Sequence, residues 1–330
     1  MPLPFILGAA AVVAGAAGVK KGLDARDTNK KAKRIIDNAK ELISKTENDR
    51  KKAVNLCEES LEKLGKIRLN SMKNLHCFIT AFNKIRYKYR TNNNFNKDIY
   101  ISSEKLEEIK LMGQFSLNIS AGIAQGSITG SLAALGAYGG TMTFATASTG
   151  TAIASLSGAA ATNATLAALG GGSLAAGGLG MMGGTAVLGG LVAGPALAIA
   201  GFTMNSKAKA NLDKAETIYD EVETACNAVR GNIDDCNNIT KHSNLYIKTT
   251  VSLDGMLSIW TRQLENILYY SGMDAEYYSK EEREIVAKAC KLAECVAAIV
   301  KVKIIDKNNK LNDQAKKELS SYQNKVIEFR

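Results

Sequence analysis

The chain has 330 residues, 46% of them hydrophobic, and its 42 basic and 32 acidic residues give a net charge of +10. This length and composition allow one large or two ordinary domains with a folded core. They exclude a dense disulfide scaffold and give little support to a metal site, because the six cysteines form no CxxC pair and the two histidines stand far apart. We interpret the cysteines as reduced thiols of a cytosolic protein.

Charge is distributed unevenly along the chain. No Asp, Glu, Lys, Arg or His occurs from Leu111 to Ser206, and 21 of the 29 glycines fall in that interval. Residues 20–110 hold 23 basic and 13 acidic residues, whereas residues 207–330 hold 19 of each. We therefore expect four regions: an N-terminal apolar helix at 1–19, a basic helical region at 20–110, a hydrophobic glycine-zipper region at 111–206 (the apolar segment) and a C-terminal helical bundle at 207–330.

The N-terminal region, residues 1–19, is uncharged after its first residue. Its basic pair, Lys20 and Lys21, follows the apolar stretch, whereas a secretory signal peptide has its basic residues in front. The pattern disfavours secretion. A short membrane anchor and a buried helix both remain open for this region.

Residues 22 to about 90 predict one long amphipathic helix. Apolar residues, among them Ile36, Ala39, Cys57 and Leu61, recur mostly at steps of three and four, and no proline interrupts them. Gly65 is the expected weak point of this helix.

A run of nine basic residues without an acidic one extends from position 63 to position 97. Such a run is typical of a surface that meets phosphate, lipid headgroups or nucleic acid. Its KIRYKYR motif alternates basic with apolar and aromatic residues, a mixture that fits a membrane interface and also single-stranded nucleic acid. The frayed end of a helix is the structural alternative. We favour an anionic lipid surface, bound by Lys84, Arg86, Lys88 and Arg90.

The apolar segment offers no chemistry for an enzyme. It has no histidine or carboxylate to act as acid or base, and no GK[ST] phosphate loop. We therefore expect neither an enzyme site nor a cofactor. Its many Leu, Ile, Val, Phe and Met residues also argue against disorder, so it must be buried in protein or in lipid.

Glycine spacing in the apolar segment favours close helix packing. Glycines recur every four residues, the pattern that lets helix backbones approach each other in a bilayer. The helix-packing glycines that we predict are Gly122, Gly126, Gly130, Gly136, Gly140, Gly180, Gly184, Gly190 and Gly194. The segment is long enough for up to four membrane spans of about 20 residues.

Membrane insertion of this segment would nevertheless be marginal, because Gly, Ala, Ser and Thr contribute little to it. A soluble form that holds the segment against the helices and later releases it would explain why the segment has glycine spacing suited to a bilayer and yet inserts only marginally. Gly201 is the expected hinge for this release.

After the apolar segment, residues 208–233 form a regular heptad seam, which requires a helical partner along its length; we expect that partner to be the helix of residues 22–68. Ser279 with Glu282 forms a capping box that opens a helix over 280–303. A last helix is expected from about residue 311.

One stretch resembles a known group of proteins. FATASTGTAIASLSGAAATNATLAALGGGSLAAGGLGMMGGTAVLGGLVAGPALAIAGF, Phe144 to Phe202, is similar to the glycine-zipper block of uncharacterised bacterial proteins, in which it lies between long charged helices after a start like MPLPFILGAAAVVAGAAGVKKGLDA. The resemblance implies membrane association. In architecture alone, an apolar hairpin between heptad helices also resembles the α-helical pore-forming toxins.

These observations predict an all-α fold in which long antiparallel coiled-coil-like helices flank an uncharged, Gly/Ala-rich hydrophobic helical hairpin. The favoured function is a cytoplasmic bacterial protein that inserts into the inner membrane, forms homo-oligomers and permeabilises the bilayer, as a toxin or defence effector would. The alternative is a coiled-coil scaffold, able to bind a protein partner, whose apolar segment is buried as core. Nucleic-acid binding is the weaker third hypothesis.

Overall fold

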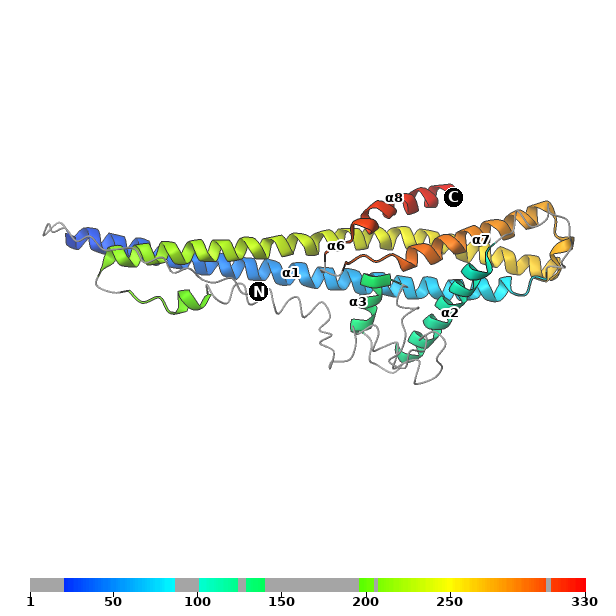
Figure 1. Ribbon diagram of the computed structural model, residues 1–330, viewed down its shortest axis with the longest axis horizontal. Helices are drawn as coiled ribbons and strands as arrows, with labels where there is room; N and C mark the ends of the chain where they lie inside the picture. Colours follow the sequence, from blue (N-terminus) through cyan, green and yellow to red (C-terminus); the bar gives the residue numbers. More distant parts are fainter. Residues whose placement is uncertain (1–20, 87–100, 124–128, 140–195, 205–206, 307–309) are drawn as a thin grey trace. The chain divides into compact units, whose positions relative to one another are not determined.

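The computed structural model describes residues 21–86, 101–123, 129–139, 196–204, 207–306 and 310–330 (Figure 1). In these ranges every regular element is a helix, which confirms the expected all-α fold. The helices are α1 (Lys21–Phe82), α2 (Ser103–Ile123), α3 (Thr129–Tyr138), α6 (Ala208–Tyr270), the short η4 (Ala275–Tyr277), α7 (Lys280–Lys301) and α8 (Asp313–Glu328). The predicted regions 1–19 and most of 111–206 lie outside the described residues.

The described residues divide into two compact units. Unit 1 contains residues 21–45, 196–204 and 207–227. Unit 2 contains residues 46–86, 101–123, 129–139, 228–306 and 310–330. Helices α1 and α6 each contribute to both units, so this division cuts across the four regions expected from composition.

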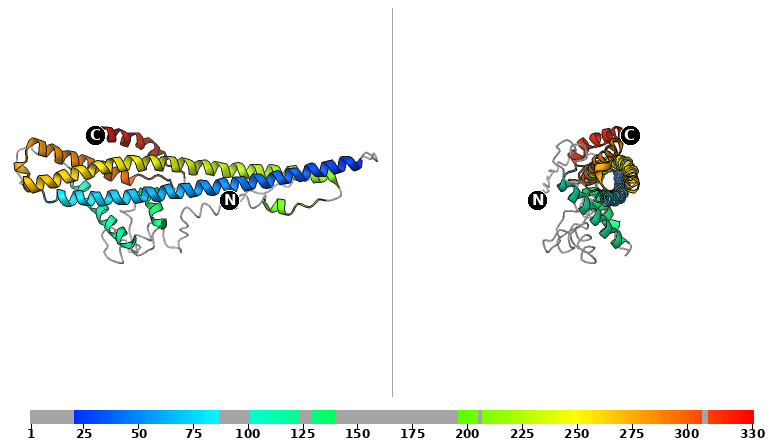
Figure 2. Two further views of the ribbon diagram at one scale, coloured as in Figure 1. Left: turned by 180° about the vertical axis from the view of Figure 1, so that it is seen from behind. Right: turned by 90° about the vertical axis from the view of Figure 1, so that its right-hand side faces the viewer.

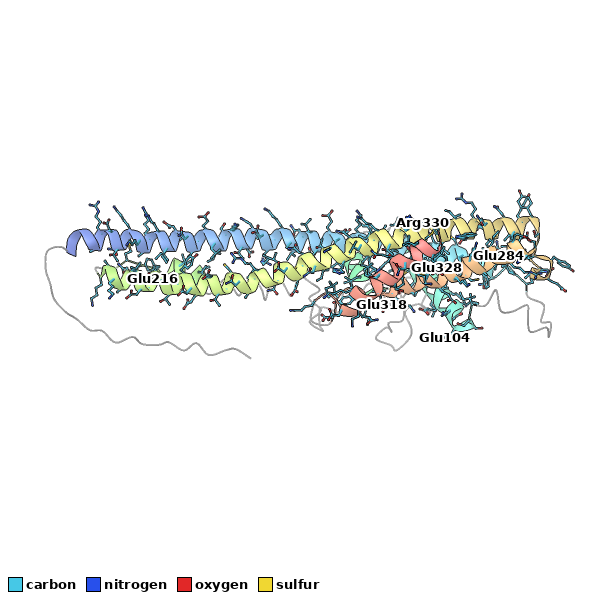
Figure 3. The ribbon with its side chains drawn as sticks, turned by 90° about the horizontal axis from the view of Figure 1, so that it is seen from above. Glu104, Glu216, Glu284, Glu318, Glu328 and Arg330 are labelled. Carbon is cyan, nitrogen blue, oxygen red and sulfur yellow. The ribbon has the colours of Figure 1, made fainter. Side chains whose placement is uncertain are left out.

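The core of unit 1 is the seam between α1 and α6. Ala32, Ile36 and Ala39 of α1 pack with Val222 and Cys226 of α6, and all five side chains are buried. The heptad pattern from residue 208 onward therefore has its helical partner where the sequence predicted it. Glu216 of α6, which is labelled in Figure 3, lies outside this seam and is exposed.

Within each unit, the parts of α1 and α6 that belong to it run parallel (Figures 1 and 2). In unit 1, Asn211 donates a 2.8 Å hydrogen bond to Asn29, 182 positions earlier. In unit 2, Asn74 donates a 2.9 Å hydrogen bond to Asp254, 180 positions later. A nearly constant separation is the mark of parallel helices, since it would change steadily in an antiparallel pair. The expected antiparallel arrangement is therefore wrong for α1 and α6.

The physical reason for this difference is that a heptad pattern defines the apolar face of a helix but not the direction of its partner. Parallel helices cannot be joined by a tight turn, and residues 83–207, among them α2 and α3, separate α1 from α6 in the chain. Antiparallel packing is found instead between α6 and α7, where Lys288 of α7 lies 5.2 Å from the Trp260 ring of α6. A short connection that contains η4 joins these two helices.

Unit 2 has a larger core, built by α1, α2, α3, α6, α7 and α8. Its fully buried side chains include Phe78 of α1, Phe115 of α2 and Tyr246 of α6. The Tyr246 hydroxyl donates a 2.8 Å hydrogen bond to the Ala315 carbonyl, which attaches α8 to α6. The last helix was predicted from about residue 311, and it begins at Asp313 with the Asn312 side chain as its cap.

The capping box at the start of α7 is confirmed. Ser279 Oγ accepts a 3.1 Å hydrogen bond from the Glu282 backbone N–H, and the Glu282 carboxylate accepts one of 2.7 Å from the Ser279 N–H. These two bonds satisfy backbone donors that a helix start otherwise leaves free. Helix α7 therefore begins at Lys280, as the sequence predicted.

Candidate functional site

The predicted anionic-surface residues are only partly described. Helix α1 ends at Phe82, earlier than the expected position near 90, and Lys84 and Arg86 follow it with exposed side chains. Arg86 is not a frayed helix end, because its backbone N–H donates a 2.7 Å hydrogen bond to the Met273 carbonyl and its carbonyl accepts one of 3.1 Å from Ala275. Lys88 and Arg90 lie outside the described residues.

Three of the predicted helix-packing glycines are described. Gly122 belongs to α2, while Gly130 and Gly136 belong to α3. Gly122 and Gly130 therefore lie on two helices, whereas a ladder of glycines requires one. The remaining glycines lie outside the described residues: Gly126, Gly140, Gly180, Gly184, Gly190 and Gly194.

Gly136 and Gly65 form a close crossing between α3 and α1. A Cβ atom on Gly136 would collide with the Leu61 carbonyl of α1, and one on Gly65 would collide with the Leu132 carbonyl of α3. Each added Cβ would also lie 3.1 Å from the backbone nitrogen of the other glycine. Helix α1 continues unbroken through Gly65, and the missing side chain at this position lets α3 approach the α1 backbone.

One turn after Gly65, Arg68 joins α3 and α7. Its side chain is fully buried. Arg68 Nη1 donates hydrogen bonds of 2.9 and 3.0 Å to the carbonyls of Leu135 and Gly136 at the end of α3. Nη2 donates a 2.8 Å hydrogen bond to the Val302 carbonyl at the end of α7. Arg68 was counted in the basic surface run, and this interpretation is wrong for it.

The surroundings of Arg68 stabilise its charge without a carboxylate. All three acceptors are carbonyls at helix C-termini, where the helix dipoles place partial negative charge. Burial lowers the pKa of Arg68 to about 9, so the guanidinium is still protonated at neutral pH. Its Nε–H is buried and has no hydrogen-bond partner. The charge is therefore held only as long as both helix ends stay in place.

The chain after α7 closes the remaining end of α3. The Ala137 carbonyl accepts hydrogen bonds of 2.7 Å from the Ile304 N–H and 3.2 Å from the Ile305 N–H. Gly139 follows with φ = +66°, and a Cβ there would lie 2.7 Å from the carbonyl oxygens of Lys301 and Val302. This position requires glycine for both reasons. We call the contacts of Gly65, Arg68, Ile304 and Ile305 with α3 the α3 anchor.

Helix α2 brings the beginning of the apolar segment into the same core. Met112, Phe115 and Ile119 are buried in unit 2. At Gly113 the helix lies so close to α1 that an added Cβ would be 2.9 Å from the Cβ of His76. The apolar face of α2 is therefore packed against protein.

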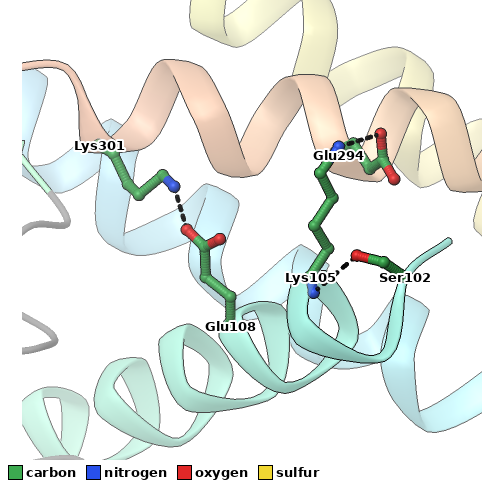
Figure 4. A network of polar contacts seen from close by, with 5 residues as sticks. All are labelled: Ser102, Lys105, Glu108, Glu294 and Lys301. Carbon is green, nitrogen blue, oxygen red and sulfur yellow. Dashed lines mark hydrogen bonds and ion pairs between the residues drawn. The ribbon is translucent and has the colours of Figure 1, made fainter.

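The charged first turns of α2 contact α7. Lys105 pairs with Glu294 at 3.0 Å, and Glu108 pairs with Lys301 (Figure 4). The Lys105 backbone N–H also donates a 3.3 Å hydrogen bond to Ser102 Oγ, which caps the start of the helix. These partly exposed pairs each contribute little to stability, but they fix the direction of α2 along α7.

The other end of the apolar segment belongs to unit 1. Residues 196–200 are helical, and Ile199 is buried with Ala215 and Val222 of α6. Gly201 ends this turn by donating a 2.9 Å hydrogen bond to the Leu197 carbonyl. A Cβ on Gly201 would come no closer than 3.4 Å to the atoms around it. The predicted hinge position therefore has room for a larger residue, whereas position 139 does not.

A cluster of exposed aromatic residues was missed by the sequence analysis. Tyr269, Tyr270 and Tyr277 are 81%, 81% and 72% exposed, and Met273 is 43% exposed. The hydrogen bonds of Arg86 with this turn bring the chain after α1 beside it. We call Lys84, Arg86 and these four residues the tyrosine tip. The signal was present in the sequence as LYYSGMDAEYY, residues 268–278.

Comparisons of the chain with protein-family models, curated proteins and solved structures find no match. In the part of the chain that the structure describes, no group of three His, Cys, Asp or Glu side chains is arranged to hold a metal ion. None of the described helices combines the length and hydropathy that crossing a membrane requires.

Proposed function

We propose that this protein is a non-enzymatic, membrane-perturbing helical protein that holds both ends of its apolar segment in folded helical units and inserts the middle, residues 140–195, into a bilayer. In this proposal, residues 111–139 stay with the bundle. Inserted segments then associate through glycines such as Gly180, Gly184, Gly190 and Gly194, which gives a homo-oligomer. The protein acts from the cytoplasm on the inner membrane of a bacterium.

The observation that carries this proposal is the attachment of both ends of the remaining segment. On one side, α3 is held by buried Arg68 and by a crossing that only glycine permits. On the other side, Ile199 is buried in the core of unit 1. Residues 140–195 between these points contain no charged residue. An uncharged stretch fixed at both ends can enter lipid as a loop without unfolding the helices that carry it.

The tyrosine tip supports contact with a membrane surface. Tyrosine is enriched where a protein meets the interface between lipid and water, because its ring is apolar and its hydroxyl is polar. Lys84 and Arg86 add attraction to anionic headgroups, about 1 kcal/mol for each charge near the surface. Asp274 and Glu276 lie in the same turn, so we expect the aromatic contribution to dominate and the preference for anionic lipid to be modest.

The burial of α2 and α3 favours a second candidate, a coiled-coil scaffold. Phe115 and Leu135, both from the apolar segment, are fully buried in unit 2. If the rest of the segment is core as well, the protein would be a soluble scaffold that binds another protein. Nucleic-acid binding has less support, because Arg68 is removed from the basic surface by burial.

Dye release from liposomes separates the two candidates. The full chain is added to vesicles of neutral or anionic lipid, and the membranes are then washed with carbonate. The proposal expects dye release and protein that resists carbonate. The matched control replaces residues 140–195 by a Gly/Ser linker of equal length and should fold but release no dye. Absence of release by a folded full chain, recovered as a soluble species, would instead support the scaffold.

A further inference from the structure

Two thiols from different helices meet in unit 2. Cys57 of α1 and Cys236 of α6 are both unoxidised. Cys236 packs against the core to which Cys57 belongs, and the two residues are 179 positions apart, close to the 180 positions between the hydrogen-bonded Asn74 and Asp254 of the same two helices. Their thiols are near enough to interact directly. Cys57 is buried, with 3% of its surface exposed, whereas Cys236 is half-buried and reaches solvent. The arrangement pairs an accessible thiol with a protected one.

The groups around the pair make the two thiols unequal. Their shared hydrogen bond lowers the pKa of Cys236 and raises that of Cys57, and burial raises the Cys57 value further. The Arg50 guanidinium favours the Cys236 thiolate, while Asp235 and Glu58 oppose it. Arg50 is held in place by Glu47, with hydrogen bonds of 2.6 and 2.9 Å. Cys236 is therefore the better nucleophile, and it is also the exposed one.

We propose that Cys57 and Cys236 are a redox modification site, at which peroxide forms a reversible disulfide that crosslinks α1 to α6. The Cys236 thiolate attacks one peroxide oxygen and the O–O bond breaks, which gives a sulfenic acid and, after protonation, one water. The Cys57 sulfur then attacks the Cys236 sulfur. The S–S bond forms, the S–O bond breaks, and the leaving hydroxide takes the Cys57 proton as a second water.

This chemistry balances: two thiols lose two electrons, and one hydrogen peroxide is reduced to two waters. A small thiol reductant reverses the reaction by thiol–disulfide exchange. The proposal does not rest on membrane insertion, because both cysteines belong to the described helices of unit 2. Its consequence is a covalent bond within the parallel pair of α1 and α6.

Other cysteines of the protein serve as internal controls. Burial raises the pKa of Cys290 to about 12 and that of Cys295 to about 11, so both should resist peroxide. Cys77 is exposed and reports whether the oxidant has reached surface thiols. Cys226 belongs to unit 1 and is fully buried.

Peptide mapping of the full chain tests the proposal. Folded protein is treated with hydrogen peroxide, free thiols are blocked with N-ethylmaleimide, and unreduced peptides are identified by mass spectrometry. We expect a peptide pair linked through Cys57 and Cys236 that dithiothreitol removes. In Cys57→Ser, the Cys236 sulfenic acid should accumulate and react with dimedone. In Cys236→Ser, Cys57 should remain a thiol.

Circular dichroism confirms that each serine variant is folded before it is compared. The proposal is overturned if Cys77 is oxidised while Cys57 and Cys236 stay unlinked in the folded protein. It is also overturned if the same pair links to an equal extent in protein unfolded by urea, since the folded contact would then play no part.

Discussion

Gly136 of α3 lies against Leu61 of α1 so closely that one added methyl group would collide with the Leu61 carbonyl. The contact is reciprocal, since Gly65 of α1 lies equally close to Leu132 of α3. Backbone meets backbone at this crossing, so no side-chain movement can make room for a larger residue. Helix α3, which belongs to the apolar segment, therefore has a fixed position against α1.

Gly136→Ala should lower the free energy of unfolding by about 2–3 kcal/mol, because an overpacked site must shift its backbone. The control is Gly255→Ala in α6, where an added Cβ meets nothing within 4 Å. That variant should be more stable than the native protein by about 0.5–1 kcal/mol, since alanine favours the helix. Urea unfolding measures both. Equal effects of the two substitutions would contradict the close crossing.

Arg68→Met should destabilise unit 2 by at least about 3 kcal/mol. The substitution keeps the length and apolar stem of the side chain but leaves three buried carbonyls without a donor. Lys66→Met removes an exposed cation two positions away and should change stability by less than about 1 kcal/mol. Thermal unfolding followed by circular dichroism compares the two variants, and similar melting temperatures would argue against a structural role for Arg68.

Asp254→Asn should change how stability depends on pH. Burial raises the pKa of Asp254, while the hydrogen bond from Asn74 opposes the shift. The folded protein therefore holds this proton at a pH where the unfolded chain has lost it, and stability due to this group falls as pH rises from about 4. We expect the asparagine variant to gain stability relative to the native protein between pH 3 and pH 7.

Urea unfolding at several pH values measures this difference. Asp313→Asn is the control of opposite sign, because a hydrogen bond from Lys316 lowers the pKa of Asp313. That variant should lose stability relative to the native protein over the same interval, by a small amount since the group is exposed. If the stability difference between Asp254→Asn and the native protein does not vary with pH, the Asp254 carboxyl has the same pKa in the folded and the unfolded protein.

Replacing Tyr270 and Tyr277 by serine should weaken binding to vesicles of any lipid charge. The control, Ile259→Ser, changes an exposed apolar residue of α6 outside the tyrosine tip, 58% accessible, and should leave binding unchanged. Replacing Lys84 and Arg86 by glutamine should weaken binding to anionic vesicles only, by up to about 30-fold at low salt. Vesicle sedimentation measures each variant. Unchanged binding after the tyrosine substitutions would show that the tyrosine tip does not contribute to membrane binding.

The sequence predicted the elements that depend on local pattern. The capping box of Ser279 and Glu282 was readable because both partners lie within one turn, and the seam of α6 was readable from its heptad spacing. The direction of α1 against α6 was not, since a heptad has the same apolar face for either direction. Arg68 looked like a surface cation because its acceptors are carbonyls 67 to 234 positions away, and no sequence pattern marks a carbonyl as an acceptor.

For the candidate site, the sequence indicated which residue types matter but not which residues they contact. Glycine spacing predicted that Gly136 packs against another glycine-rich helix of the apolar segment, whereas Gly136 contacts α1, which lies outside that segment. The absence of charge suggested that the apolar segment is one region beginning at Leu111. The packing of Phe115 and Leu135 in unit 2 places the first part of that region in a protein core, because burial against protein and burial in lipid select the same residues.

A fluorescence measurement tests the central claim, that residues after Gly139 enter lipid while α2 and α3 stay with the bundle. In a background without the native cysteines, an environment-sensitive dye is attached at Ser173→Cys or at Leu117→Cys, an exposed position of α2. On adding liposomes, the account predicts a blue shift and quenching by lipid-bound quencher at position 173, with neither change at position 117. Changes at both positions would contradict the α3 anchor, and no change at position 173 would contradict insertion itself.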